Sequence, residues 1–137
     1  MKVINATQFK NDVARICVQG TAEHFGRVQR AVALTALKHI VINTPVDTGR
    51  ARGGWQVDID AVPTGSGRID KTGHETYSKP IPKVDGPGHC INIANNVEYI
   101  GYLENGTPPH GNHPGTAPHA MVDRAIIQTL QTYARKV

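Results

Sequence analysis

The sequence predicts an α+β protein, in which a long N-terminal helix and a C-terminal helix pack on a small antiparallel sheet. Apolar residues recur with a helical period over 21–43 and again after Pro118. Apolar and polar residues alternate over 55–61 and 91–93, which is typical of strands with one buried face. The chain has 137 residues, enough for one hydrophobic core but not for two, so we expect residues 1–137 to form a single domain.

The composition narrows the class of protein. The sequence has no run of 18 apolar residues, and its N-terminus lacks the apolar segment of a signal peptide. We therefore expect a soluble, non-exported protein with no membrane partner. Cys17 and Cys90 have no CxxC partner, which favours two separate thiols over the alternative of a disulfide.

The N-terminal region is predicted to form two helical segments. Thr7 can cap the first, and Gln19-Gly20 is expected to break or bend it, because glycine is unfavourable inside helices. Thr21 can cap the long helix, which Pro45 ends. The apolar face predicted for the long helix comprises Phe25, Val28, Val32, Thr35, Ala36 and Ile40.

Residues 44–50 (TPVDTGR) are predicted to form a turn that directs the following strand. Asp47 and Thr48 can bond to amides of the turn itself, and Gly49 supplies a free backbone angle. An active-site loop is the alternative, but no nucleophile–base pair stands nearby in the sequence. In the strand that follows, Trp55 is expected to lie in the core.

Two segments rich in glycine and proline are predicted to be long exposed loops. Residues 62–88 match no periodic pattern, and the Gly-Ser-Gly at 65–67 lacks the lysine and helix of a phosphate-binding loop. Residues 105–117 cannot form a core helix or a central strand because prolines interrupt them. Loops of such length usually carry function, and we expect an interface role.

A short apolar corner precedes the second loop. Tyr99, Tyr102 and Leu103 recur at the spacing of a single helical turn, which Asn105-Gly106 closes. Because tyrosine is favoured at interface cores, we hypothesise that these three residues anchor an interface. Burial in the chain's own core is the alternative.

The second loop and its end carry three histidines, His110, His113 and His119, which are candidate zinc ligands. No cysteine or clear carboxylate accompanies them, and the loop offers no rigid second shell to fix their tautomers. We therefore expect no metal and no other cofactor.

The last helix is predicted to follow Pro118, which suits a first helical turn. Its predicted apolar face comprises Met121, Val122, Ala125, Ile126, Leu130 and Tyr133.

Basic residues are concentrated near the N-terminus: the first 56 residues hold eight Lys or Arg against three Asp or Glu, and the rest hold seven against eight. The simplest interpretation is a solvated helix face. The alternative is that Arg27, Arg30 and Lys38 face DNA passing through a channel. A dedicated nucleic-acid reader would carry a denser basic stripe with interleaved aromatics.

The residue patterns do not favour an enzyme. GxSxG, HExxH and P-loop motifs are absent. Glu98 and Glu104 lie six residues apart around a corner, which is a poor basis for a paired-carboxylate mechanism.

Three motifs occur in order, TPVDTGRARGGW at 44–55, NNVEYIGYLENG at 95–106 and APHAMV at 117–122. Together they resemble the tail-component family of long-tailed bacteriophages, the tail-completion or neck proteins of the head–tail joint. The resemblance spans residues 22–130. Family members often have a short Ser-Lys-Gln link between the second and third motifs, whereas this chain has the longer loop with its histidines.

The resemblance implies a structural virion protein without catalytic residues, which assembles with copies of itself as a hexameric ring. It implies a place in the virion neck, reached after assembly in the host cytoplasm. The implied partners are capsid connector and adaptor proteins, tail terminator or tail tube proteins, and genome DNA in the channel. A tail terminator or head-closure protein is the alternative of the same class. A small nucleic-acid-binding accessory protein and a zinc-dependent hydrolase are alternatives of other classes.

Overall fold

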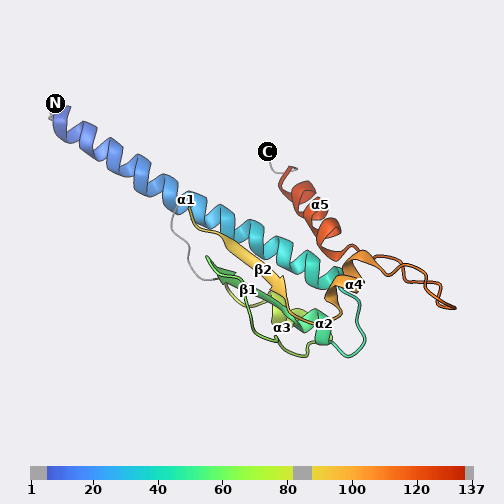
Figure 1. Cartoon of the computed structure of the whole chain (residues 1–137). Coiled ribbons are helices and arrows are strands. Elements are labelled where there is room, and N and C mark those ends of the chain that lie inside the picture. The colour runs from blue at the N-terminus through green and yellow to red at the C-terminus, as the bar shows by residue number, and fades with distance from the viewer. Residues whose placement is uncertain (1–5, 82–87, 135–137) are drawn as a thin grey trace.

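The computed structural model describes residues 6–81 and 88–134, which form the α+β fold that the sequence predicts. Figure 1 shows α1 running along the molecule, with α5 on one side of it and the two strands on the other. The elements, in chain order, are α1 (Ala6–Asn43), α2 (Arg50–Gly53), β1 (Trp55–Ile59), α3 (His74–Tyr77), β2 (Ile91–Asn95), α4 (Ile100–Asn105) and α5 (Met121–Ala134).

The sheet consists of β1 and β2, paired antiparallel with Trp55 opposite Asn95 and Ile59 opposite Ile91. The sequence predicts both strands, because apolar side chains alternate with polar ones in each. Within the described residues the sheet has only these two strands, so each strand keeps one edge without a strand partner.

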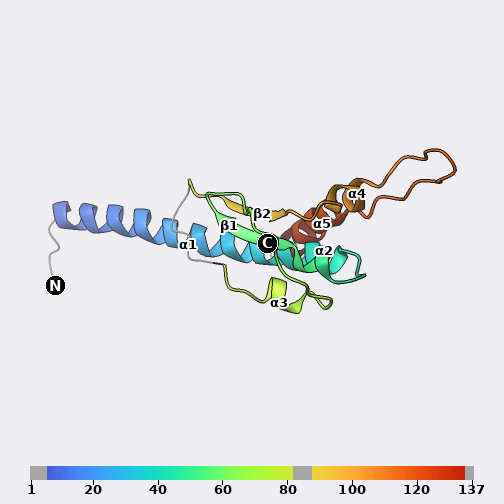
Figure 2. The same cartoon turned by 60° about the horizontal axis from the view of Figure 1, so that its bottom comes forward.

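The helix α1 is continuous over 38 residues, and the predicted break at Gly20 is wrong. A glycine inside a helix costs only about 1 kcal/mol relative to alanine, which the helical hydrogen bonds on both sides outweigh. At 1.5 Å per residue the helix is about 57 Å long. Its N-terminal part runs beyond the other elements, as both ribbon views show (Figures 1 and 2).

The core lies against the C-terminal part of α1. Its buried cluster comprises Leu37, Ile40, Val41, Trp55, Met121 and Ala125. The predicted burial of Trp55 is confirmed. The predicted apolar face of α1 is only partly right, since Phe25 and Val28 are 45% and 43% exposed. Strands of five residues are too short to cover a helix of this length.

The helix α5 packs along α1 and buries a narrow stripe of Met121, Ala125 and Thr129, spaced by four residues. Ile126 and Leu130, which the sequence places on the buried face, are 50% and 65% exposed. The main contact of α5 is with α1; such a contact follows one row of side chains and leaves the flanking residues in solvent.

Residues 62–81 differ from the exposed loop predicted for 62–88. They include α3, and the side chains of Asp70 and Thr76 are buried. The backbone N–H of Asp70 donates to the carbonyl of Gly49 at 3.0 Å, which fastens the segment to the turn after α1. Residues 82–87 lie outside the described part of the chain.

Residues 105–117 leave α4 and form an arm that projects from the end of the molecule (Figures 1 and 2). Thr107 pairs with Thr116, and His110 pairs with His113 near the tip. Between these two pairs the three prolines are exposed and Gly115 is half-buried. None of the described helices holds an apolar stretch able to span a membrane.

Candidate functional site

The motif at 44–55 forms a joint between the end of α1 and the sheet. Thr44 is fully buried, and its Oγ1 accepts a hydrogen bond from Trp55 Nε1 at 2.9 Å. Nearby, the guanidinium of Arg52 donates to the carbonyl of Thr44 at 2.9 Å and to that of Lys71 at 3.0 Å. These contacts give the motif a structural role, as the interpretation of a turn predicts.

A groove of about 440 Å³ lies where the first two motifs meet. One wall is the turn 45–51, and the other is formed by Tyr99 and Leu103. Tyr102 lies outside this groove and is 64% exposed, whereas Leu103 packs against the core cluster. Of the three residues proposed for an interface, Leu103 therefore belongs in part to the core, whereas Tyr99 and Tyr102 remain accessible.

The basic residues proposed for a DNA channel share one side of α1. Arg27 and Lys38 are exposed and Arg30 is half-buried. Lys38 lies eleven residues after Arg27, which amounts to about 16 Å along the helix axis. The ammonium of Lys38 lies 5.9 Å from the ring centroid of Tyr77, a cation–π geometry.

The histidines of the arm do not converge. The rings of His110 and His113 stack at 5.2 Å with an interplanar angle of 18°. His119 lies at the base of the arm, where its backbone N–H donates to the carbonyl of Leu103. Among the described residues no three His, Cys, Asp or Glu side chains form a metal-binding group.

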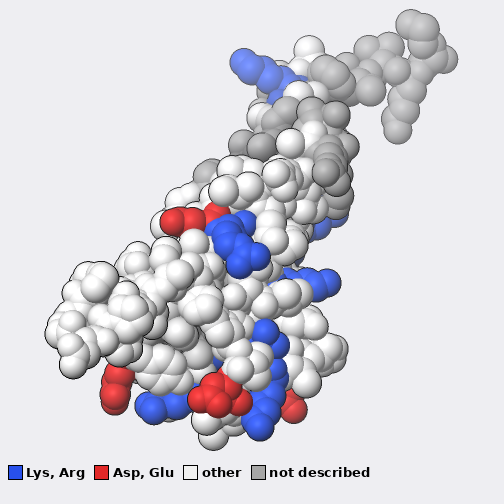
Figure 3. All heavy atoms as spheres, turned by 90° about the vertical axis from the view of Figure 1, so that its right-hand side faces the viewer, with Lys and Arg blue, Asp and Glu red and all other residues white. Residues whose placement is uncertain are grey.

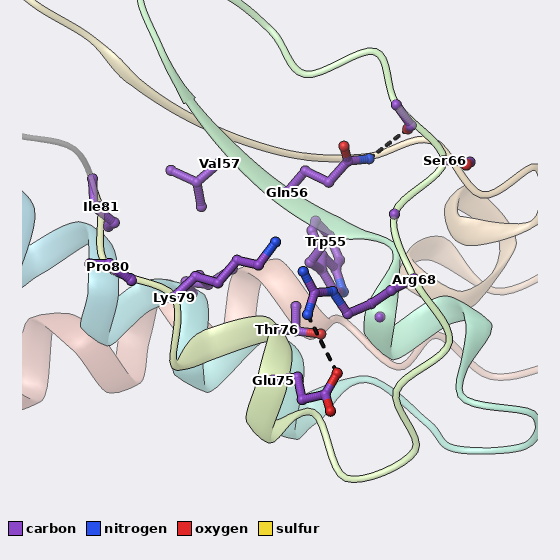
Figure 4. Close-up of a pocket in the computed structure, with 14 residues that line it drawn as sticks. Trp55, Gln56, Val57, Ser66, Arg68, Glu75, Thr76, Lys79, Pro80 and Ile81 are labelled. Atoms are coloured by element: carbon purple, nitrogen blue, oxygen red, sulfur yellow. Dashed lines mark hydrogen bonds and ion pairs between the residues drawn. The ribbon is translucent and has the colours of Figure 1, made fainter.

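A larger groove, of about 680 Å³, borders β1 (Figure 4). Three consecutive residues of the strand line it, Trp55, Gln56 and Val57. Successive strand residues point to opposite faces of a sheet, so a hollow that touches all three lies at the edge of the strand. Because β2 occupies the other edge, this groove follows the open edge of β1. We call it the β1-edge groove.

The 62–81 segment forms the other sides of the β1-edge groove, with residues 65–68, 75–76 and 79–81. Figure 4 shows the side chains of Arg68 and Lys79 extending into the space in front of Trp55. Arg68 Nη1 lies 3.4 Å from Glu75 Oε2, and their side chains are 33% and 73% exposed. Sequence patterns miss this groove because it depends on how the 62–81 segment folds back.

Two carboxylates near these surfaces have shifted pKa values. The backbone N–H of Cys90 and the ring of His89 hold the pKa of Asp60 below its ordinary value of 3.8. Burial alone would raise the pKa of Asp70, but hydrogen bonds from Thr76, Gly73 and Thr72 outweigh it and lower that pKa. Both carboxylates are therefore charged at neutral pH.

The described residues present the two grooves above, a projecting arm and exposed apolar side chains, an arrangement suited to contact with other chains. Comparison with protein-family models, with curated proteins and with solved structures gives no match to this chain. The family resemblance therefore depends on the three motifs alone.

Proposed function

We propose that this chain is a structural subunit of a bacteriophage head–tail joint, a tail-completion or neck protein that assembles as a ring. The observation that carries the proposal is the row of large apolar side chains that α5 leaves exposed: Ile126, Ile127 and Leu130 are 50%, 56% and 65% exposed. On α1, Phe25 and Val28 are 45% and 43% exposed. Exposed apolar surface of this kind is typical of a contact with another chain.

Exposed apolar surface on two helices matches the needs of a ring. Each subunit of a closed ring has two different patches, one for each neighbour. The exposed residues of α1 and of α5 supply apolar surface for such patches.

The shape of the chain supports the same proposal. The arm and the three residues that follow it, 105–120 in all, contain no Lys, Arg, Asp or Glu. In the end-on view of Figure 3 a large area free of charged side chains lies to one side, with charged residues gathered below it. A projecting element without charge can be buried against a neighbour without desolvating ions.

The six-fold stoichiometry, the place between connector and tail tube, and the passage of DNA depend on the resemblance. In this arrangement Tyr99 and Tyr102 contact a neighbouring subunit, and Arg27, Arg30 and Lys38 face the DNA channel. Neutralising the three basic residues should weaken genome retention in assembled particles. Retention equal to that of the wild type would exclude the channel role.

The test of the proposed function combines assembly in solution with assembly in the virion. Light scattering at several concentrations and negative-stain images should show rings with a central opening. In cells that produce the virion, omission of this protein should leave filled heads and free tails that do not join. Joined particles without the protein would contradict the proposal.

The same preparations also test the two alternative functions. A monomer with stoichiometric zinc would favour the hydrolase. Salt-dependent binding of short DNA duplexes by a monomer would favour the nucleic-acid-binding accessory protein.

A further inference from the structure

The open edge of β1 offers unpaired backbone groups to the β1-edge groove. The N–H of Asp60 donates to the carbonyl of Cys90 at 2.8 Å, next to the pair Ile59–Ile91. Hydrogen-bonded and non-hydrogen-bonded pairs alternate in an antiparallel ladder. The backbone of Val57, three residues before Asp60, therefore points its N–H and C=O away from β2. The described residues supply no hydrogen-bond partner for these two groups.

The floor of the β1-edge groove is apolar, since Leu37, Trp55 and Val57 line it. Its volume of about 680 Å³ lies within the range of about 300–1,000 Å³ that is usual for ligand sites. An extended segment in this groove could exchange backbone hydrogen bonds with Val57 and place alternate side chains on the apolar floor.

The charged side chains of the β1-edge groove determine which kind of segment it favours. Arg68 and Lys79 line it together with one carboxylate, Glu75. The ion pair between Arg68 and Glu75 is long, at 3.4 Å, and Glu75 is largely exposed. The groove therefore keeps a net positive charge, which favours a segment with an acidic side chain.

We propose that the β1-edge groove binds an extended acidic segment of a partner protein, which pairs with β1 as a third strand. A two-stranded sheet is marginally stable, so a third strand also strengthens the fold. The arm of a second copy is a poor occupant, because its prolines 108, 109 and 114 have no N–H and it has no acidic residue. The inference depends on the proposed function only for the source of the segment, a neighbouring virion protein.

The experiment uses the full chain and the acetylated, amidated pentapeptide Thr-Val-Glu-Val-Thr as the probe. We expect the peptide to shift the amide signals of Gln56 and Val57 and the indole signal of Trp55 in two-dimensional NMR spectra. The matched peptide with glutamine in place of glutamate should bind several-fold more weakly. A peptide N-methylated at its central residues should not bind, because it loses the donors that pair with the strand.

Variants of the protein test whether the basic residues of the groove contribute to peptide binding. Arg68→Gln combined with Lys79→Gln should weaken binding of the glutamate peptide about tenfold. The control Lys71→Gln removes an exposed cation that does not line the groove, and it should leave binding unchanged. A dissociation constant of about 5 mM is weak even for a short segment, so absence of binding up to that peptide concentration would overturn the proposal. Equal binding of the glutamate and glutamine peptides, or of the N-methylated peptide, would also overturn it.

The two proposals fail separately. Rings and joined particles from a protein that does not bind the peptide would leave the neck function intact and exclude only the groove. Peptide binding by a protein that the virion does not need would exclude the neck function and retain the groove.

Discussion

The indole nitrogen of Trp55 donates a hydrogen bond to Thr44 Oγ1 at 2.9 Å, and the same hydroxyl donates to the carbonyl of Ile40 at 2.7 Å. One buried hydroxyl thus connects the first residue of β1 to the last turn of α1. Its removal leaves a buried N–H without a partner. The positions of the helix and the sheet relative to each other depend on this contact.

Thr44→Val should therefore destabilise the protein by about 1–3 kcal/mol, the usual cost of an unsatisfied buried donor. Chemical denaturation followed by the fluorescence of Trp55 measures the change. Thr129→Val is the matched control, because the buried hydroxyl of Thr129 donates only to the carbonyl of Ala125 in its own helix. Equal effects of the two substitutions would mean that the Trp55 contact adds nothing.

Arg52 and Arg50 belong to the same motif and should differ in their contribution to stability. The half-buried guanidinium of Arg52 donates to the carbonyls of Ile42 and Thr44, close to the C-terminus of α1. Arg50 is exposed. We expect Arg52→Gln to lower the free energy of unfolding by about 1–3 kcal/mol, because charge-assisted hydrogen bonds are lost. Arg50→Gln should change it by less than about 0.5 kcal/mol.

The carboxylate of Asp70 should make the stability depend on pH. Its Oδ1 accepts from the N–H of Gly73 at 2.9 Å, and its Oδ2 accepts from that of Thr76 at 3.0 Å. The folded state lowers this pKa below 3.8, so the contribution is complete above that pH and is lost as the pH falls through the folded value.

Asp70→Asn should therefore be less stable than the wild type at pH 7, and the difference should shrink below about pH 4. Thermal unfolding between pH 7 and pH 3 measures both curves. Asp47→Asn, at an exposed position, serves as the control and should follow the wild type. A constant difference at every pH would show that the charge of Asp70 contributes nothing.

The continuity of α1 through Gly20 can be tested by Gly20→Pro. Proline inside a helix costs about 3 kcal/mol or more, so the substitution should interrupt α1 and reduce the helical circular dichroism signal. The N-terminal part of α1 runs beyond the core, so the midpoint of global unfolding should change little (Figure 1). An unchanged dichroism signal would indicate two separate helices, as the glycine suggests in the sequence.

A substitution at Tyr102 tests the proposed subunit interface without disturbing the core. Its side chain is 64% exposed and lies outside the buried cluster. Tyr102→Ala should leave the unfolding free energy within about 0.5 kcal/mol of the wild type. It should weaken ring assembly about tenfold or more if the residue lies at the centre of an interface, measured by light scattering. Wild-type assembly with lowered thermal stability would contradict the interface role.

The elements of this protein depend on local signals, and these are readable in the sequence. Pro45 ends the long helix because the residue before proline leaves the helical region. Alternation of apolar and polar residues gives β1 and β2 with Trp55 on the buried face. Gly106, with φ of 72°, ends α4 at a backbone angle that other residues rarely adopt.

The tertiary structure alone decided which parts of these elements are buried and where grooves form. Phe25, Val28 and Leu130 satisfy a helical period, but their burial depends on which elements reach them. The short strands cover little of α1, and α5 has only one main helix neighbour, so these side chains stay exposed. The segment at 62–81 reads as a loop, yet the buried hydrogen bonds of Asp70 fold it back on the core. That fold places Arg68 and Lys79 at the open edge of β1, a relationship between distant residues that no local period can encode.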